Sequence, residues 1–213
     1  MAELFLVDKP YGWSSFRAVS WVKKRFGVSK AGHAGTLDPL ATGLLLIPTG
    51  SATQQVSTLQ SLDKEYYALL VLGYRTVSDD AEFPPEYVAS PKFLTRAERQ
   101  AILRPFVGEI EQRPPAYSAL KINGRRAYQL ARRGEVVDMP VRRVEIYDIQ
   151  EIAYEPPHRW LLRIICGKGV YIRSLARDIG MATGWGAYLG ALRRTRIGPY
   201  TVYQALQPDG CLS

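Results

Sequence analysis

The sequence contains few of the residues that form covalent cross-links or metal sites. Among its 213 residues are two cysteines, Cys166 and Cys211, and two histidines, His33 and His158. The cysteines lie far apart and show no metal-ligand spacing, so we expect reduced thiols and a cytoplasmic location. With only two histidines a zinc site is not expected, and no metal is predicted.

The chain also lacks long apolar segments. No run approaches the ~18 residues that a membrane span requires. The N-terminal residues, MAELF, contain no basic segment followed by an apolar core, so no secretory signal is predicted. A chain of this length can bury about 70% of its unfolded surface without cross-links. We therefore expect one domain over residues 1–213.

Acidic residues are outnumbered in this sequence. There are 20 acidic and 28 basic residues, which gives a net charge of +8. Such an excess favours a polyanionic partner without identifying it. Most of the excess lies between residues 121 and 143, where only Glu135 and Asp138 are acidic. The basic residues of this segment are Lys121, Arg125, Arg126, Arg132, Arg133, Arg142 and Arg143.

Apolar runs bounded by glycine or proline predict several strands. Residues 4–7, 64–73, 141–153 and 160–166 have this pattern, and a last strand is expected to run through Tyr203. The unbroken apolar run at residues 44–47, closed by Pro48, is typical of a short strand buried on both faces.

Capping signals and helical spacing predict the helices. Ser14 and Gly27 are the expected N-cap and stop of a first helix, with apolar residues at 16, 19, 22 and 26. A short helix is expected over residues 51–62. Thr95 and Glu98 form a capping-box pattern that opens a helix through Phe106. Apolar residues at 172, 175, 176 and 179 predict a further short helix.

The stretch around Asp38 is predicted to be a tight loop joined directly to the buried strand. Residues 32–43 read GHAGTLDPLATG, and the three glycines permit backbone shapes that other residues resist. Pro39 keeps Asp38 out of the helical region and so narrows the directions of its carboxylate. From these residues alone, an ordinary turn is at least as good an interpretation as a catalytic loop.

A basic helix is predicted over residues 125–133, ended by Gly134. At about 100° per residue, this helix places Gln129 and four arginines on one face. An ordinary solvated surface could have this composition. The absence of acidic residues among the four arginines favours phosphate contacts instead, because phosphates would neutralise their mutual repulsion. The arginines are Arg125, Arg126, Arg132 and Arg133.

Considered singly, four other residues have ordinary structural interpretations. Lys9 is typical of a surface lysine, Tyr66 and Tyr171 of core aromatic residues, and Arg173 of a surface ion pair.

Taken together, the motifs closely resemble the TruB family, the tRNA pseudouridine(55) synthases. Residues 32–43 resemble the family's catalytic-aspartate signature, in which Asp38 has the position of the aspartate. The family's first motif is similar to KPYGWSS at residues 9–15, and its RNA-gripping insertion to RPPAYSALKINGRRAY at residues 113–128. GVYIR at residues 169–173 resembles an active-site motif, and LRRTRIGPY at residues 192–200 also matches.

The resemblance covers nearly all of the chain in the correct order, from Lys9 to about Val202, with two departures. Val170 replaces a common threonine, and Phe83 replaces a glycine that often follows the acidic residues of its segment. We therefore assign no role to Asp79 and Asp80.

The resemblance implies an α+β pseudouridine synthase fold. This fold has a mixed, largely antiparallel central sheet flanked by helices, with an inserted RNA-binding thumb at about residues 112–140. The implied reaction converts a T-loop uridine of tRNA, at position 55, to pseudouridine. It breaks the N-glycosidic bond, rotates the uracil and rejoins it through carbon 5. This isomerisation involves no redox change and no external group, so no cofactor is implied.

The resemblance also implies which residues perform the chemistry. Asp38 is the expected catalytic residue, acting either as a nucleophile or as a base toward the ribose, and the sequence does not separate these chemistries. Arg173 is expected to pair with Asp38, keeping its carboxylate ionised and oriented. Tyr171 is the expected base for the final proton removal at carbon 5.

Four residues are expected to bind a uridine that has been flipped out of the folded tRNA. Tyr66 would stack on the flipped base, and His33 would occupy the space that the base leaves. Leu192 would pack in the uracil pocket, and Lys9 would help to shape the site. The expected partner is the T-arm stem-loop of tRNA, bound by a monomer with no obligatory protein partner and no membrane.

Two alternatives remain. A non-catalytic RNA-binding or tRNA-folding protein on the same scaffold would explain the arginines equally well, but it would not explain the intact catalytic set. A related synthase that acts on another RNA through a protein complex is disfavoured by DPLATG at residues 38–43, which resembles the stand-alone bacterial type. Many relatives continue into a small C-terminal RNA-binding domain. Because only about ten residues follow Tyr203, no such domain is expected here.

Overall fold

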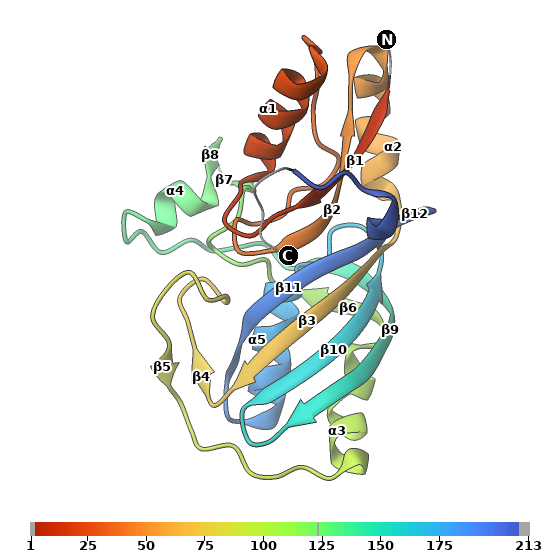
Figure 1. Cartoon of the computed structure of the whole chain (residues 1–213). Helices are drawn as coiled ribbons and strands as arrows, with labels where there is room; N and C mark the ends of the chain where they lie inside the picture. The colour runs from red at the N-terminus through yellow and green to blue at the C-terminus, as the bar shows by residue number, and fades with distance from the viewer. Residues whose placement is uncertain (1–2, 123, 209–213) are drawn as a thin grey trace. The chain divides into compact units, whose positions relative to one another are not determined.

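The computed structural model describes residues 3–122 and 124–208 (Figure 1). Its main sheet has eight strands in the order β1-β2-β11-β3-β10-β9-β6, and β12 pairs with β11. The pairs β1–β2, β6–β9 and β11–β12 are antiparallel, whereas β2 and β11 are parallel. Helices accompany this sheet, so the predicted α+β fold with a mixed, largely antiparallel sheet is confirmed. No helix in the described part of the chain is long and apolar enough to cross a membrane.

The chain divides into two compact units. The first comprises Met1–Tyr67, Ile165–Lys168 and Leu192–Ser213, and the second comprises Ala68–Ile164 and Gly169–Ala191. That residues 1–213 act as a single catalytic domain stays a prediction.

The first unit is built around β1 (Leu4–Lys9) and β2 (Thr42–Pro48). The two strands pair in a register that joins Leu4 to Pro48 and Lys9 to Gly43. One face of the pair packs on α1 (Ser15–Phe26), through residues 7, 18, 19, 22, 45 and 47. The other face packs on α2 (Val56–Ser61) and on η3 (Val202–Gln204), through residues 44, 46, 59 and 202. The predicted strand at residues 44–47 is therefore buried on both faces, as its unbroken apolar run indicated.

The second unit is built on the 68–72 end of β3 (Lys64–Leu72), on β9 (Arg142–Glu155) and on most of β10 (Arg159–Cys166). Its other elements include β4 (Tyr74–Arg75), β5 (Glu86–Tyr87) and β6 (Gly108–Gln112). Helices α3 (Arg96–Leu103) and α5 (Ile172–Thr183) lie behind these strands in Figure 1. The predicted apolar stripe of α5 is buried, since residues 172, 175, 176 and 179 are at most 4% exposed.

The predicted helix ends are confirmed where their capping chemistry was recognised. The Ser14 hydroxyl accepts the Arg17 N–H at 3.1 Å, and Gly27 ends α1 with φ 65°. Thr95 and Glu98 form the complete capping box of α3, which continues into the 3₁₀ turn η2 (Arg104–Phe106). Residues 51–62 fall within the 3₁₀ helix η1 (Gly50–Gln55) and α2. Two positions of the apolar α1 pattern differ, because Phe16 is 75% exposed and Phe26 is 40% exposed.

The predicted helix over residues 125–133 is wrong at both of its ends. Arg125 and Arg126 form strand β8, which pairs with β7 (Lys121–Ile122), and helix α4 covers only Ala127–Ala131. Gly124 has φ 80°, a conformation that favours a tight reversal, so the chain forms a hairpin before the helix begins. The four arginines therefore do not share one helical face.

The C-terminal strand also differs from its prediction. Strand β11 spans Ala187–Ile197, β12 is confined to Tyr200–Thr201, and residues 202–204 form η3. Gly198, with φ 51°, turns the chain between the two strands. The Gln204 side chain then accepts the Thr201 N–H at 2.9 Å, which closes the 3₁₀ turn and ends the strand before Tyr203.

Candidate active site

The loop that carries Asp38 is held on both sides of the aspartate. The Ser15 hydroxyl donates to the Leu37 carbonyl and accepts the Leu37 N–H, each at 2.9 Å. On the other side, the Pro39 carbonyl accepts the Gly12 N–H at 2.9 Å. Asp38 itself is half-buried. Its carboxylate is therefore partly exposed, and the backbone that carries it is anchored on both sides.

Lys9 is fully buried beneath this loop, and its interpretation as a surface lysine is excluded. Its ammonium group donates to the carbonyls of Trp13 at 2.7 Å, Pro10 at 3.1 Å and Pro39 at 3.3 Å. Burial lowers the pKa of Lys9 from 10.5 to about 8, against the opposing influence of the Asp38 carboxylate. Lys9 thus joins β1 to the loop on the C-terminal side of Asp38.

Arg194 is a second buried cation of the first unit, and it was not identified from the sequence. It is 1% exposed, and its guanidinium donates to the carbonyls of Leu44 at 2.7 Å and Gly35 at 3.1 Å. The same guanidinium lies 6.0 Å from the centre of the Tyr66 ring. The motif at residues 192–200 includes Arg194, but neither its spacing nor its charge distinguishes it from the arginines on either side.

The predicted base-binding residues of the first unit differ in burial. Tyr66 is 8% exposed, and burial raises the pKa of its phenol. His33 is half-buried, and among the described residues its buried Nδ1 has no hydrogen-bond partner. Burial, followed by the charge of Arg194, lowers the pKa of His33 and favours a neutral imidazole. Leu192 is half-buried, and its carbonyl accepts the Thr42 hydroxyl at 3.4 Å.

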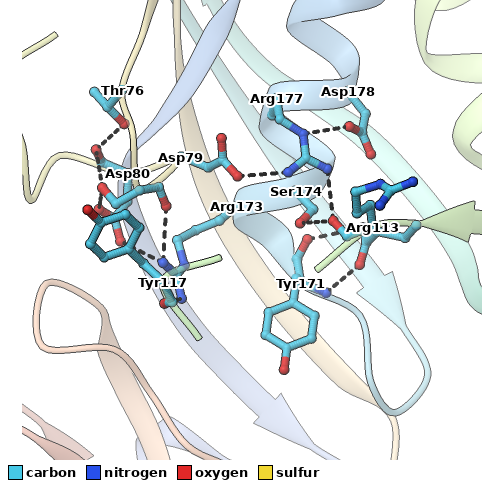
Figure 2. A network of polar contacts seen from close by, with 12 residues as sticks. Thr76, Asp79, Asp80, Arg113, Tyr117, Tyr171, Arg173, Ser174, Arg177 and Asp178 are labelled. Atoms are coloured by element: carbon cyan, nitrogen blue, oxygen red, sulfur yellow. Dashed lines mark hydrogen bonds and ion pairs between the residues drawn. The ribbon is translucent and has the colours of Figure 1, made fainter. Parts of the chain in front are cut away.

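Tyr171 occupies the N-cap position of α5 in the second unit. Its backbone N–H donates to Gln112 Oε1 at 2.8 Å, and its carbonyl accepts Gln112 Nε2 at 3.1 Å. Figure 2 shows the Tyr171 ring pointing away from the polar contacts that surround its backbone. The phenol is therefore separated from the network that holds the main chain.

Arg173, in the first turn of the same helix, lies in a buried polar network (Figure 2). It is 5% exposed and donates to the carbonyls of Ser78 at 3.1 Å and Tyr117 at 3.0 Å. Its Nη1 lies 3.4 Å from Asp80 Oδ2. Asp38 belongs to the first unit and Arg173 to the second, and the pairing of these two side chains stays a prediction.

The two aspartates that received no role from the sequence hold the arginines of α5. Asp80 pairs with Arg173, while Asp79 accepts from Arg177 at 2.9 Å. Asp79 has φ 61°, rare for a residue with a side chain, and burial raises its pKa to about 6 against the effect of Arg177. The sequence shows a pair of acidic residues before the thumb and, much later, two arginines four residues apart. That the aspartates meet the arginines depends on the fold.

The four predicted RNA-binding arginines are all exposed on the thumb, which we define as residues 112–140. One of them, Arg132, has an acidic partner: its guanidinium lies 2.6 Å from Glu82 Oε1. Arg132 therefore has an acidic partner in the folded chain, although no acidic residue lies among the four arginines in the sequence.

Other reactive groups offer little chemistry. Cys166 is a free, buried cysteine, and burial raises the pKa of its thiol to about 12. Cys211 lies outside the described residues. Within the described residues, no group of three or more histidine, cysteine, aspartate or glutamate side chains could hold a metal ion.

Comparison with known proteins places these residues in a family. Residues 23–172 match the model described as TruB family pseudouridylate synthase (N terminal domain). Residues 173–208 match the model of the tRNA pseudouridylate synthase B C-terminal domain. Together the matched segments include Asp38, Tyr66, Tyr171 and Arg173.

Curated relatives agree with the family models. The chain is 47% identical over 197 residues to tRNA pseudouridine synthase B of Xanthomonas campestris, covering 92% of this chain and 64% of that protein. It is 42% identical over 215 residues to tRNA pseudouridine synthase B of Parabacteroides distasonis, covering 97% of this chain and 90% of that protein. The chain thus spans somewhat less than two thirds of the length of its Xanthomonas relative.

Solved structures show the same fold. A chain from the crystal structure of a Cbf5-Nop10-Gar1 complex aligns with a TM-score of 0.74 and 32% identity, over 96% of this chain and 51% of that chain. A chain from an H/ACA RNP bound to a substrate RNA containing 2'-deoxyuridine aligns with a TM-score of 0.70 and 30% identity, over 96% and 50% of the two chains. With the family models and the curated relatives, these alignments show that the chain belongs to the TruB family of pseudouridylate synthases.

Proposed function

We propose that this chain is a tRNA pseudouridine synthase that isomerises the T-loop uridine at position 55. In this reaction the bond from ribose carbon 1′ to uracil N1 breaks, and the uracil rotates. A bond then forms between carbon 1′ and carbon 5, N1 gains a proton, and carbon 5 loses one. The observation that carries the proposal is the anchored Asp38 loop within a family-matching sequence. The names of the curated relatives at 42–47% identity support the substrate.

Asp38 is the proposed catalytic residue, as a nucleophile or as a base toward the ribose. The contacts of Leu37 and Pro39 support this role, because they limit movement of the backbone on either side of the carboxylate. A carboxylate held in one position reacts faster than a mobile one, since less conformational entropy is lost on reaching the transition state. The buried charge of Lys9, which contacts the Pro39 carbonyl, further favours an ionised Asp38.

Tyr171 is the proposed base for removal of the carbon 5 proton, and Arg173 the proposed partner of Asp38. The contacts of Arg173 with Ser78, Tyr117 and Asp80 support its role, because they limit where its guanidinium can lie. A planar guanidinium in a fixed orientation can hold a carboxylate more specifically than a lysine ammonium.

The remaining proposed contacts bind the RNA. Tyr66 stacks on the flipped base, His33 occupies the vacated space, Leu192 packs against the uracil, and Lys9 shapes the site. The neutral state favoured for His33 is compatible with insertion among bases. The arginines of the thumb, which are exposed, contact phosphates.

The test is substitution of Asp38 by asparagine, which keeps the shape of the side chain and removes its charge. We expect pseudouridine formation on unmodified tRNA to be lost, while binding to the same tRNA remains within a few-fold of wild type. The protein is assayed alone, and modified positions are mapped by base-specific chemistry. Asp148→Asn is a matched control, because Asp148 is a partly exposed aspartate of β9 that is remote in sequence from the Asp38 loop.

Each outcome separates the candidate functions. Wild-type turnover in Asp38→Asn contradicts the catalytic assignment. An inactive wild-type protein that still binds and refolds tRNA favours the non-catalytic alternative. Activity that appears only after other proteins are added, or only on another RNA, favours a synthase that works within a complex.

A further inference from the structure

Gln112 is a buried amide at the junction between the sheet and the thumb. It is the last residue of β6 and is 1% exposed. A buried primary amide must find partners for its oxygen and its nitrogen, because leaving either of them unsatisfied is destabilising. Both atoms of Gln112 are satisfied by one residue, Tyr171.

The two contacts form a closed pair on the Tyr171 backbone. Gln112 Oε1 accepts the Tyr171 N–H at 2.8 Å, and Nε2 donates to the Tyr171 carbonyl at 3.1 Å. A single hydrogen bond leaves the bonded group free to rotate, whereas two bonds to the same residue fix its position and its orientation. Gln112 therefore holds the backbone from which the Tyr171 phenol extends.

The segment that precedes Tyr171 has a permissive backbone. The chain enters through residues 167–170, which contain two glycines, and Gly169 has φ 83°. Tyr171 is the N-cap of α5, and its side chain makes no capping hydrogen bond to the helix. On the following side, the Tyr171 carbonyl accepts the Leu175 N–H at 3.0 Å as the first helical bond. Gln112 thus supplies the contact at the point where a glycine-containing loop becomes a helix.

The residues that follow Gln112 also contact the N-terminal half of α5. We call residues 112–117 the thumb root. The Arg113 carbonyl accepts the Ser174 hydroxyl at 2.8 Å and Arg177 Nη2 at 2.9 Å, and the Tyr117 carbonyl accepts from Arg173 (Figure 2). The root of the thumb and the first turns of α5 are therefore joined at three places, and Gln112 is the place that acts on Tyr171.

We propose that Gln112 is a positioning residue that sets the orientation of Tyr171 for proton removal at carbon 5. This inference rests on the proposed function, because it assumes that Tyr171 is the base. Gln112 does not touch the uridine. It acts through the Tyr171 backbone, so its loss affects the proton-removal step more than RNA binding.

The first test is Gln112→Ala, which removes both contacts. We measure single-turnover pseudouridine formation at saturating tRNA, together with tRNA affinity. We expect the rate to fall between about 10-fold and 100-fold, the range typical of a small misplacement of a catalytic group, with affinity within about threefold of wild type. We also expect a larger kinetic isotope effect with uridine deuterated at carbon 5, because removal of that proton becomes slower.

The matched control is Thr183→Ala, at the opposite end of the same helix. The Thr183 hydroxyl donates to the Gly180 carbonyl at 2.8 Å, so this variant also removes a hydrogen bond from α5. We expect an unchanged isotope effect and a near wild-type rate. Equal losses in both variants, without a larger isotope effect for Gln112→Ala, would show that Gln112 only stabilises the helix. Absence of any activity in the wild-type protein refutes the proposed function instead.

The second test is Gln112→Glu, which keeps the size of the side chain and therefore leaves no cavity. A protonated glutamic acid has the shape of glutamine and can donate its O–H to the Tyr171 carbonyl, whereas the carboxylate has no donor. Burial raises the pKa of such a carboxyl group. We therefore expect the rate of Gln112→Glu, relative to wild type, to be highest at low pH and to fall as pH rises. A constant ratio across pH overturns the proposal.

Discussion

Two buried cations of the first unit are satisfied mainly by backbone carbonyls. Lys9 donates to three carbonyls and Arg194 to two. Carbonyl oxygens carry only partial negative charge, so they offset the desolvation of a cation incompletely. This explains why the pKa of Lys9 is lowered although a carboxylate lies near.

The lowered pKa of Lys9 predicts how stability depends on pH. Its folded pKa of about 8 lies below the ordinary 10.5, so between these values the unfolded chain binds more protons than the folded one. The free energy of unfolding therefore rises with pH across this window. The contribution is at most about 3–4 kcal/mol, because the two pKa values, 10.5 and about 8, differ by about 2.5 and each pKa unit corresponds to about 1.36 kcal/mol. Urea unfolding between pH 7.5 and 10.5 should show this rise in wild type and a smaller one in Lys9→Met.

An exposed lysine supplies the comparison. Lys92→Met should leave the pH dependence of wild type unchanged, since Lys92 is exposed. If Lys9→Met and wild type have the same slope, the Lys9 ammonium is not desolvated in solution.

The surroundings of Gly43 predict that any side chain placed there would clash at the start of β2. It has φ 103°, and a Cβ built there would overlap the Arg194 carbonyl oxygen. Because that neighbour is backbone of the paired strand β11, it cannot move aside cheaply. We expect Gly43→Ala to lower the free energy of unfolding by more than about 2 kcal/mol, measured by urea unfolding.

Gly27 is the matched control for Gly43. It also has a positive φ, 65°, but no atom lies within 4 Å of a Cβ built there. We expect Gly27→Ala to cost about 1 kcal/mol, which is the conformational effect alone. Equal costs for the two variants would contradict close packing between β2 and β11.

At the scale of elements, the thumb combines a hairpin with a short helix. Arg125 and Arg126 form β8, whereas Arg132 and Arg133 follow the end of α4, so the four arginines extend from different local backbones. A phosphate backbone can still contact all four, because electrostatic attraction does not need a single helical face.

The thumb arginines predict the salt dependence of tRNA binding. Replacing Arg125, Arg126, Arg132 and Arg133 by alanine should weaken binding, because fewer counterions are released. The slope of log affinity against log salt should become shallower by roughly 0.7–0.9 for each phosphate that the variant no longer binds. Saturated turnover should change much less. The measurement is tRNA affinity between about 50 and 200 mM salt.

A second quadruple variant controls for total charge. Arg75, Arg96, Arg104 and Arg159 are also exposed but lie outside the thumb. Their replacement by alanine removes the same charge, and we expect a smaller change in slope. Equal changes of slope in the two variants would assign the effect to net charge alone. The thumb arginines would then be part of an ordinary solvated surface.

At the scale of the whole molecule, the net charge of +8 predicts electrostatic steering of RNA. Oppositely charged partners associate faster at low ionic strength, and salt screens this attraction beyond about 10 Å at 0.1 M. We expect the association rate with tRNA, measured by stopped-flow fluorescence, to fall as salt rises. The single-turnover rate at saturating tRNA should stay nearly constant. A salt-independent association rate would show that the charge plays no part in encounter.

Local chemistry determined much of the fold from the sequence. The helix ends at Ser14, Gly27 and Thr95, and the buried strand at residues 44–47, depend on neighbours within a few positions, so their patterns are readable directly. The family resemblance was readable for the same reason, because each motif is a contiguous segment. The helix over residues 125–133 was predicted wrongly because the pairing of β7 with β8 outweighs the helical spacing of the arginines.

Only the tertiary structure decided which polar residues become buried partners. Lys9 meets Pro39 across 30 positions, Gln112 meets Tyr171 across 59, and Arg177 meets Asp79 across 98. None of these pairs has a local signal, because the same residue types at the surface would be ordinary solvated side chains. The sequence by itself determined which motifs are present. The pairing of distant strands and helices determined which side chains hold them in place, because desolvated polar groups must find partners wherever the fold provides them.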